Sequence, residues 1–467
     1  MYLIFIFFSF ISIVYSDTIS LKSKEPLKSV LEVKNLDKGK ALDFIFEDQI
    51  PISSTLYQIQ DGVDIRVSYS YGNNSAQVLD SSIENVLLES GYEVDENFIF
   101  PKSNLIVSEP QVFRGLVVRQ ITFIPFTYNI QTKELVMLRD IQIDVEQFLI
   151  DTPISSNENM KLSRAFEPLY ESLIVNYERS TRDEDYQAPS ILYICGGSSI
   201  NNSYVQDLFE WRHKTGYIVN AVSTGDIGGS STASVKGYIQ SAYDNWENPP
   251  EIVGLIGDTD VIDCFYQQWG QGWNSYNGAT DFDYTQLDGN DLIPDVFIGR
   301  ISGQQTSTME NVINKTIQYE KALYVDSDWF NKAALVGDPV ESGNSTVFTN
   351  QYIENLMINH GMTEVATDYD GYGISSFVIN QFQDGILYYN YRGIYGDEGT
   401  GASSQFNNGY ETPFVTTMTC GTGDFDNGNS QSEGFVKMGS VNNPEGAVAA
   451  VGISTTGTHT AYNNIVD

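Results

Sequence analysis

The sequence predicts an α/β protein: a mostly parallel sheet flanked by helices, preceded by a β-rich N-terminal region. From Ala188 onward, short apolar runs rich in β-formers alternate with amphipathic segments, the pattern of a parallel sheet covered on both faces. Residues 17–150 instead carry stretches in which apolar and polar residues alternate, as expected for half-exposed antiparallel strands. Gly, Asp or Cys repeatedly follows a strand, and these positions converge on one edge of a parallel sheet.

Composition limits the class of protein. The chain has 467 residues, enough for two or three domains, and 41% of them are hydrophobic, enough for a substantial core. It carries 61 acidic against 25 basic residues, a formal net charge of −36. This charge argues against nucleic acid or an anionic membrane as a partner. We expect a monomer whose surface acidity keeps it in solution.

The N-terminus has the composition of a secretory signal. Residues 2–14 are almost wholly apolar, and Val14 and Ser16 are small enough for cleavage before Asp17. This run is too short to span a bilayer comfortably, and no later segment approaches eighteen apolar residues. Residues 1–16 are therefore predicted to be a signal peptide, and the mature protein is predicted to be secreted without a membrane span.

The first predicted domain and its connector occupy residues 17–185. Clear alternation runs through 64–71, 116–126 and 140–146, and 129–133 fits a hairpin turn, so this region resembles a β-sandwich. Between 151 and 188 the chain turns polar, with one short helix predicted over 162–174. The charged stretch 177–185 has the composition of an exposed linker, where proteases cut. Arg179 and Arg182 are candidate processing sites, although an ordinary solvated linker fits equally well.

The second predicted domain, residues 186–467, alternates strands with helices. A long helix is expected from 306 to 324, and a long loop, Gly- and aromatic-rich, from 263 to 291. Loops of this length in compact domains are often functional. The predicted strands are 190–195, 217–222, 252–258, 295–300, 332–338, 385–390, 414–419 and 447–452.

Acidic residues at the end of this long loop suggest a cation site. Asp281, Asp283, Asp288 and Asp291 could supply oxygen ligands to a structural Ca²⁺. Their spacing does not match an EF-hand, so a plain acidic loop is the alternative. We expect no cofactor to be required for chemistry.

Two predicted strand ends organise the second domain, one over 384–396 and one over 413–425. The second ends on Cys420, one of only three cysteines, with Cys195 in a predicted core strand and Cys264 in a loop. A thiol at a strand end can be partly exposed, activated by a neighbouring base and set beside backbone N–H donors. Cys420 is therefore a candidate nucleophile, with an inert buried thiol as the alternative.

An ordered set of motifs resembles the gingipain-like cysteine peptidases, peptidase family C25 of the caspase-related clan. The motifs are Ser108–Gly115 and Phe126–Leu135, then Gly257-Asp258, Thr280-Asp281, Leu287–Arg300 and Lys315–Glu320, and finally Thr419–Phe425, Ser432–Phe435 and Pro444–Gly452. The resemblance implies a pro-domain up to about residue 185, removed near basic residues, and then a caspase-like catalytic domain. Relatives often continue beyond the position of Asp467, so truncation there is one interpretation of the sequence.

The resemblance also implies roles for individual residues. Cys420 matches the family's nucleophile, Asp258 an acid that can orient the catalytic histidine, and Asp281 a position that can select a basic substrate side chain. Gly393 and Gly421 fall in the turns that build the oxyanion site. The implied activity is that of a secreted cysteine endopeptidase, made as a zymogen and acting on protein or peptide substrates.

The sequence departs from the family at the catalytic histidine. The family's Gly-His-Gly turn corresponds to residues 391–396, where Ile394 stands in the histidine's position. Isoleucine cannot accept a proton, so a second interpretation is a catalytically impaired pseudopeptidase that acts as a binding protein. Of the three histidines, His213 is expected at the surface and His360 at a helix C-terminus. Only His459, after the strand that follows Cys420, fits a substitute base, and a structural role in its loop is the alternative.

Overall fold

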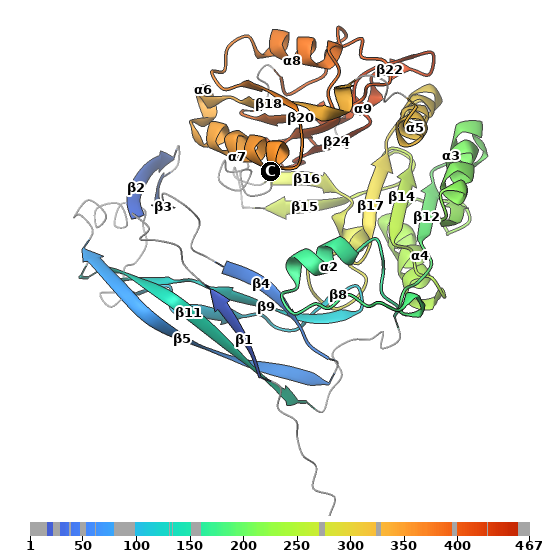
Figure 1. Cartoon of the computed structure of the whole chain (residues 1–467). Helices are drawn as coiled ribbons and strands as arrows, with labels where there is room; N and C mark the ends of the chain where they lie inside the picture. The colour runs from blue at the N-terminus through green and yellow to red at the C-terminus, as the bar shows by residue number, and fades with distance from the viewer. Residues whose placement is uncertain are drawn as a thin grey trace, which may run out of the picture. The chain divides into compact units, whose positions relative to one another are not determined.

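The computed structural model describes residues 16–21, 29–36, 39–46, 53–60, 62–78, 99–129, 131–132, 134–150, 160–269, 276–323, 328–394, 399–426 and 428–455. The chain forms two compact units (Figure 1). Unit 1 comprises Met1–Tyr186 and Asp288–Ile293, and unit 2 comprises Gln187–Leu287 and Pro294–Asp467. Residues 1–15 of the predicted signal peptide lie outside the described residues, and Ser16 begins the first strand, β1.

The described residues of unit 1 form two larger antiparallel sheets and one two-stranded antiparallel pair, which confirms the β-rich N-terminal region. The apolar residues of β11 alternate with polar ones, so Ile141, Ile143 and Val145 are buried while Gln142 faces solvent. These side chains pack against Ile121 and neighbours from the other sheet. One sheet holds β1 (Ser16–Leu21), β5 (Val63–Val78), β6 (Ile99–Phe100), β10 (Phe126–Asn129) and β11 (Glu134–Leu149). The other sheet holds β4 (Ser53–Gln58), β7 (Leu105–Val107), β8 (Gln111–Phe113) and β9 (Leu116–Phe123). Strand β2 (Ser29–Leu36) pairs with β3 (Gly39–Phe46).

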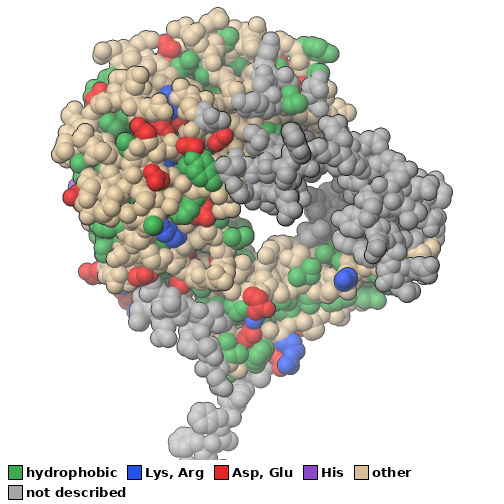
Figure 2. Space-filling model, turned by 180° about the vertical axis from the view of Figure 1, so that it is seen from behind, with side chains coloured by type: hydrophobic (Ala, Val, Ile, Leu, Met, Phe, Trp, Pro, Cys, Tyr) green, Lys and Arg blue, Asp and Glu red, His purple; other side chains and the backbone are tan. Residues whose placement is uncertain are grey.

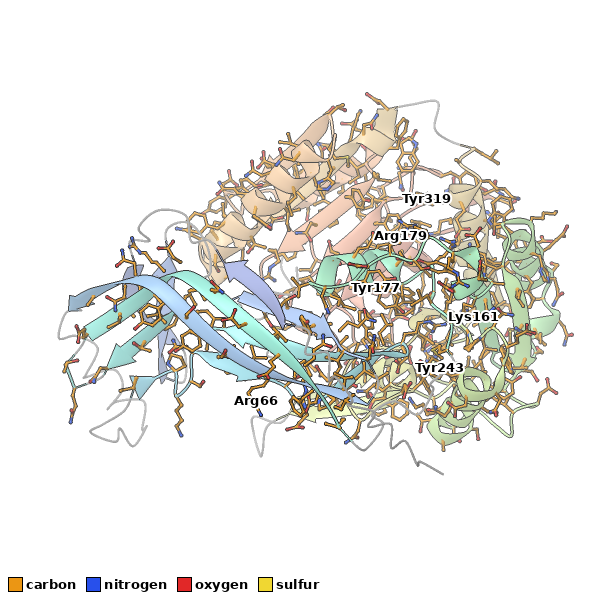
Figure 3. The ribbon with its side chains drawn as sticks, turned by 60° about the horizontal axis from the view of Figure 1, so that its bottom comes forward. Arg66, Lys161, Tyr177, Arg179, Tyr243 and Tyr319 are labelled. Atoms are coloured by element: carbon orange, nitrogen blue, oxygen red, sulfur yellow. The ribbon has the colours of Figure 1, made fainter. Side chains whose placement is uncertain are left out.

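The predicted connector is partly ordered by ion pairs. Helix α2 (Glu167–Leu173) is shorter than the predicted 162–174 and packs Tyr170 edge-on against a phenylalanine of β8. After it, the Tyr177 hydroxyl donates to Glu167 Oε1 at 2.9 Å, and the Arg179 guanidinium lies 3.5 Å from Glu171 Oε1. Tyr177 and Arg179 therefore lie beside α2 (Figure 3). Arg182 follows on extended backbone.

The first sheet of unit 2 has four parallel strands in the order β13-β12-β14-β17. Helix α3 begins at the cap of Asn202, whose side chain accepts from Tyr204 N, and α4 begins at the cap of Ser231. The elements are β12 (Ser190–Cys195), α3 (Ser203–Lys214), β13 (Ile218–Ser223), α4 (Thr232–Asn245), β14 (Ile252–Ile256), β17 (Phe297–Ile301) and α5 (Thr306–Glu320).

The second sheet of unit 2 has five parallel strands in the order β19-β18-β20-β21-β24. Its core gathers Phe382 of α8, Phe406 and Phe435 of α9 in stacked contacts. Both sheets of this unit are parallel and accompanied by helices (Figure 1), as the alternation predicted. The elements are β18 (Lys332–Gly337), α6 (Pro339–Ser342), α7 (Ser345–Asn359), β19 (Glu364–Asp368), α8 (Ile374–Gln383), β20 (Tyr388–Arg392), β21 (Phe414–Thr417), α9 (Gln431–Lys437), β22 (Gly439–Ser440), β23 (Asn443–Pro444) and β24 (Ala449–Gly452).

The prediction of one long loop over 263–291 is wrong. The segment forms an antiparallel hairpin, β15 (Phe265–Trp269) and β16 (Tyr276–Thr280), followed by a 3-10 turn at Phe282–Thr285. Its two strands pair from Phe265 opposite Thr280 to Trp269 opposite Tyr276, which the Gly- and aromatic-rich sequence did not reveal. Across the described parts of the chain, no helix is both long and apolar enough to cross a membrane.

Candidate active site

Cys420 lies three residues beyond β21, at the carboxyl edge of the second parallel sheet. Its side chain is partly exposed, whereas those of Cys195 and Cys264 are buried. Strands β20 and β21 pair with Tyr391 opposite Thr417. Ile394 and Cys420 follow these neighbouring parallel strands, two and three residues beyond their ends, at the same edge of the sheet. The structure therefore brings together the two strand ends that the sequence singled out.

The turn after Cys420 is held by hydrogen bonds to its own strand and to β24. The Thr422 hydroxyl donates to Thr419 O at 2.9 Å, and Gly421 N–H donates to Thr455 O at 3.0 Å. A Cβ at Gly423 would lie 2.6 Å from the carbonyl carbon of Gly452, so only glycine permits this approach. The Gly421 N–H, predicted to serve the oxyanion site, is already engaged inside the protein.

The turn after β20 is compact and offers no base at Ile394. A Cβ at Gly393 would lie 2.9 Å from Asp338 Cβ, and the Tyr391 hydroxyl donates to Ile394 O at 3.2 Å. The Ile394 side chain is exposed. This turn keeps a shape that could present an imidazole, but its side chain cannot exchange a proton.

Neither described histidine lies at the edge that carries Cys420. His213 is at the end of α3, where the chain returns to the amino end of β12 through a hydrogen bond from Ile218 N to Pro189 O. His360 caps α7, and Thr363 N then donates to Asn331 O, directly before β18 begins. Both rings therefore lie at the amino edges of their sheets. His459 is outside the described residues.

Asp258 follows β14 and belongs to a buried ionic cluster. Its Oδ2 lies 3.5 Å from Lys437 Nζ, and its Oδ1 accepts from Thr259 N at 2.8 Å. Lys437 also pairs with Glu433 at 2.7 Å, and Glu433 accepts a hydrogen bond from the Ser302 hydroxyl at 2.6 Å. The cluster joins α9 to the carboxyl edge of the first sheet. The role of Asp258 as an orienting acid stays a prediction.

Asp281 is engaged by Arg300 in a two-pronged ion pair. Arg300 Nη2 lies 2.7 Å from Asp281 Oδ1, and Arg300 Nε lies 2.8 Å from Asp281 Oδ2. The guanidinium also donates to the carbonyls of Gly257 and Ile262 and lies over the Phe425 ring at 5.3 Å. A basic substrate side chain would have to displace Arg300 to reach this carboxylate, so substrate selection by Asp281 stays a prediction.

The β15–β16 hairpin contacts the segment after Cys420, a contact that the sequence pattern did not predict. The Tyr266 hydroxyl donates to Asp426, and Asp424 accepts from Ala279 N–H. Burial raises the pKa of the Asp424 carboxyl, and it raises the pKa of the Cys264 thiol, which is hydrogen-bonded to Tyr266. The hairpin therefore fixes the loop that follows the candidate nucleophile. Only the acidic residues of that loop could have suggested a partner.

Each of the predicted calcium ligands accepts a hydrogen bond within the protein. Asp283 accepts from the Gln267 amide at 3.0 Å, Asp288 accepts from Gly289 N at 2.9 Å, and Asp291 accepts from Val112 N at 2.7 Å. Among the described residues there is no group of three His, Cys, Asp or Glu side chains able to hold a metal ion. Calcium binding by Asp283, Asp288 and Asp291 stays a prediction.

Comparisons with known proteins agree with this geometry. The family model described as Peptidase family C25 matches residues 184–467, and the model Propeptide_C25 matches residues 52–183. Gingipain R2 of Porphyromonas gingivalis is 27% identical over 353 residues, covering 72% of this chain and 46% of the relative. Lys-gingipain of the same organism is 24% identical over 263 residues, covering 54% of this chain and 15% of the relative.

Solved structures show the same fold. A crystal structure of the Arg-specific cysteine proteinase gingipain R matches with a TM-score of 0.52 and 23% identity, covering 61% of this chain and 66% of that chain. A complex of the pro- and mature domains of a Porphyromonas gingivalis gingipain matches with a TM-score of 0.51 and 24% identity, covering 58% and 65%. This chain spans about half the length of Gingipain R2. Its second unit has the α/β fold of the gingipains, and the chain belongs to peptidase family C25, with a propeptide region of that family before it.

Proposed function

We propose that the chain is a secreted cysteine endopeptidase, made as a zymogen, in which Cys420 attacks the peptide carbonyl. The observation that carries this proposal is the position of Cys420. Its thiol is partly exposed at the carboxyl end of a parallel strand, beside the strand end that presents the family's base. The other two thiols are buried, and burial raises the pKa of Cys195 to about 12, which keeps that thiol protonated.

The reaction needs a base that Ile394 does not provide. A thiol near its ordinary pKa of about 8.5 is only a few per cent thiolate at neutral pH. His459 is the proposed substitute, because it follows Thr455 by four residues and the Thr455 carbonyl bonds to Gly421 N–H. The base takes the thiol proton, the thiolate forms an acyl thioester, and the protonated base returns the proton to the leaving amine. Water then hydrolyses the thioester and releases the acid product.

Processing is proposed near Arg182. Its side chain is exposed, its backbone is extended, and it lies one residue before the end of the propeptide match. A protease needs an extended, accessible backbone, and this position offers one. Cleavage after Arg182 would sever the covalent link between the propeptide region and the peptidase region.

A second candidate function is a pseudopeptidase that binds partners without cleaving them. Three observations favour it: Ile394 replaces the histidine, Lys437 pairs with Asp258, and Arg300 pairs with Asp281. All three reduce the capacity for proton transfer or for selecting a basic side chain.

A cleavage assay separates the two functions. The processed protein is incubated with Arg- and Lys-containing fluorogenic peptides and with unfolded protein, under reducing conditions with and without Ca²⁺. The peptidase predicts turnover that Cys420→Ala abolishes and that His459→Ala reduces by about 10²–10⁴-fold, the usual contribution of a general base. Cys195→Ala is the matched control and keeps the activity. If neither wild type nor Cys420→Ala cleaves any substrate, the peptidase proposal is refuted and the pseudopeptidase interpretation remains.

A further inference from the structure

Helix α7 presents an apolar stripe to solvent. Phe348, Tyr352 and Leu356 are spaced four residues apart, so they lie along one face of the helix. Their exposures are 65%, 66% and 41%. Single exposed apolar residues are ordinary, but aromatic side chains in a continuous row mark a surface that binds another molecule. We refer to these three residues as the α7 stripe.

The buried face of α7 is polar and its exposed face is apolar, the opposite of an ordinary surface helix. Its buried side chains are Thr346 and Asn350. The Thr346 hydroxyl donates to Asp338 O at 2.9 Å, and the Asn350 amide donates to Val336 O at 3.1 Å and accepts from Asn390 Nδ2 at 3.0 Å. Hydrogen bonds therefore dock α7 on the sheet, and its largest apolar side chains are not needed for the core. The stripe requires another explanation.

The stretch of chain that carries the stripe is acidic. Residues 333–391, which include α7, contain seven Asp or Glu and no Lys or Arg. Glu354 lies on α7 itself and is held by the Tyr369 hydroxyl at 3.0 Å. Beyond β19, Asp370 accepts from Tyr372 N, and Tyr372 is itself exposed. Figure 2, which does not label α7, shows acidic side chains spread over the described residues of one face of the molecule, among few basic ones.

We propose that the α7 stripe docks a basic amphipathic helix from another protein. The apolar face of that helix covers Phe348, Tyr352 and Leu356, and its Lys and Arg side chains meet Glu354 and the neighbouring carboxylates. Helices that recognise one another in this way use apolar residues at spacings of three and four, and complementary charge selects the partner. The inference concerns a surface of the peptidase unit and does not depend on whether Cys420 is active.

Charge disfavours two other occupants of such a face, a second copy of this chain and an anionic membrane. A second copy would bring another formal charge of −36 to an acidic surface. An anionic lipid surface would be repelled by the same carboxylates. A basic amphipathic helix can bury its apolar side chains against the α7 stripe and place its positive charges near the acidic residues, so both features favour its binding.

Fluorescence anisotropy of the full-length chain with designed peptides tests the proposal. The probe is a labelled helical peptide of about 18 residues, roughly five turns, with Leu on one face and Lys and Arg elsewhere. One control peptide has the same composition with the leucines scattered, and another has Glu in place of Lys and Arg. We expect saturable binding of the first peptide alone, weakened by salt because screening reduces the attraction.

Protein variants assign the binding to this face. Phe348→Ser/Tyr352→Ser removes two exposed rings without opening the core, and it should weaken binding by about tenfold or more, as removal of aromatic anchors does. Leu323→Ser, at another exposed apolar site, is the matched control and should bind normally. Glu354→Lys should weaken binding of the basic peptide and strengthen binding of the acidic one.

Several results would overturn the proposal. Binding of the scattered or acidic peptide as tightly as the basic helix would remove the claimed recognition, as would full affinity in the double variant. Light scattering that shows a dimer lost in the double variant would assign the stripe to a second copy. Vesicles of phosphatidylcholine with phosphatidylglycerol that bind wild type but not the double variant would assign it to a membrane.

Discussion

Replacing Lys315 with methionine should change how the stability of the protein depends on pH. Lys315 is 1% exposed, and its ammonium donates to the carbonyls of Val436, Met438 and Glu445 at 2.6, 3.1 and 2.8 Å. Burial lowers its pKa from 10.5 to about 7, although the nearby charge of Glu445 acts in the opposite direction. The lysine joins α5 to the end of α9, the helix that follows the Cys420 turn.

The sign and size of the effect follow from the two pKa values. Between pH 7 and 10.5 the unfolded state binds more protons than the folded state, so the free energy of unfolding rises with pH in this window. Each unit contributes about 1.36 kcal/mol, so stability should rise by about 3 kcal/mol from about pH 7 to about pH 9.5. Lys315→Met lacks this contribution, and it also leaves three buried carbonyls without their donor.

Urea unfolding of wild type and Lys315→Met at the two pH values measures the effect. Lys214→Met serves as the control, because Lys214 is exposed on α3 and should behave like wild type. The gap between wild type and Lys315→Met should widen by about 3 kcal/mol at the higher pH. If the two proteins differ in free energy of unfolding by the same amount at both pH values, the pKa of Lys315 is not lowered in the folded state. The three carbonyls would then offset the effect of burial, and the reasoning would be refuted.

Three further substitutions test the candidate site. Ile394→His should raise kcat/KM on peptides by about 10²–10⁴-fold if the rest of the site is competent, and no gain over wild type would indicate that more than the base is missing. Arg300→Met should lower the free energy of unfolding by about 3–5 kcal/mol, because it leaves the Asp281 carboxylate without its cation. Adding Asp281→Asn should recover part of this loss. If urea unfolding finds no recovery, the ion pair does not contribute as expected. Lys437→Met should cost about 3 kcal/mol by the same assay, since Asp258 is buried, and an unchanged midpoint would show that this carboxylate does not depend on the lysine.

The strands that the sequence predicted well are those buried on both faces. Ser190–Cys195 is buried at every position, so it appears in the sequence as a continuous apolar run. Strand β19 (Glu364–Asp368) was missed because it is an edge strand with exposed Glu364 and Thr367 and only partly buried neighbours. The β15–β16 hairpin was missed because its residues do not alternate between apolar and polar. In both cases tertiary pairing formed a strand that local pattern did not favour.

The candidate site was predictable in position but not in its ion pairs. The run that ends at Cys420 is a strand followed by a Gly-containing turn, and this pattern alone places the thiol at the sheet edge. Asp258 and Lys437 are separated by 179 positions along the chain, so no local signal links them. The sequence showed Asp281 as an acidic residue of a loop. Its partner Arg300 lies on strand β17, and the strand sequence does not indicate which residue the guanidinium contacts.

The bond between Gly421 N–H and Thr455 O ties the start of the Cys420 turn to the last described residue of the chain. If Gly421 serves the oxyanion site as predicted, its amide can turn toward a substrate only when the segment after β24 moves aside. The hydrogen-exchange rate of Gly421 N–H therefore reports how often the turn is released. Gly423 N–H donates to Ile453 O and serves as the comparison. Faster exchange at Gly421 alone indicates local release, whereas equal exchange at both amides indicates fraying of the whole strand end. For a peptidase that uses this amide as an oxyanion donor, the rate of this opening sets an upper limit on turnover, whatever group acts as the base.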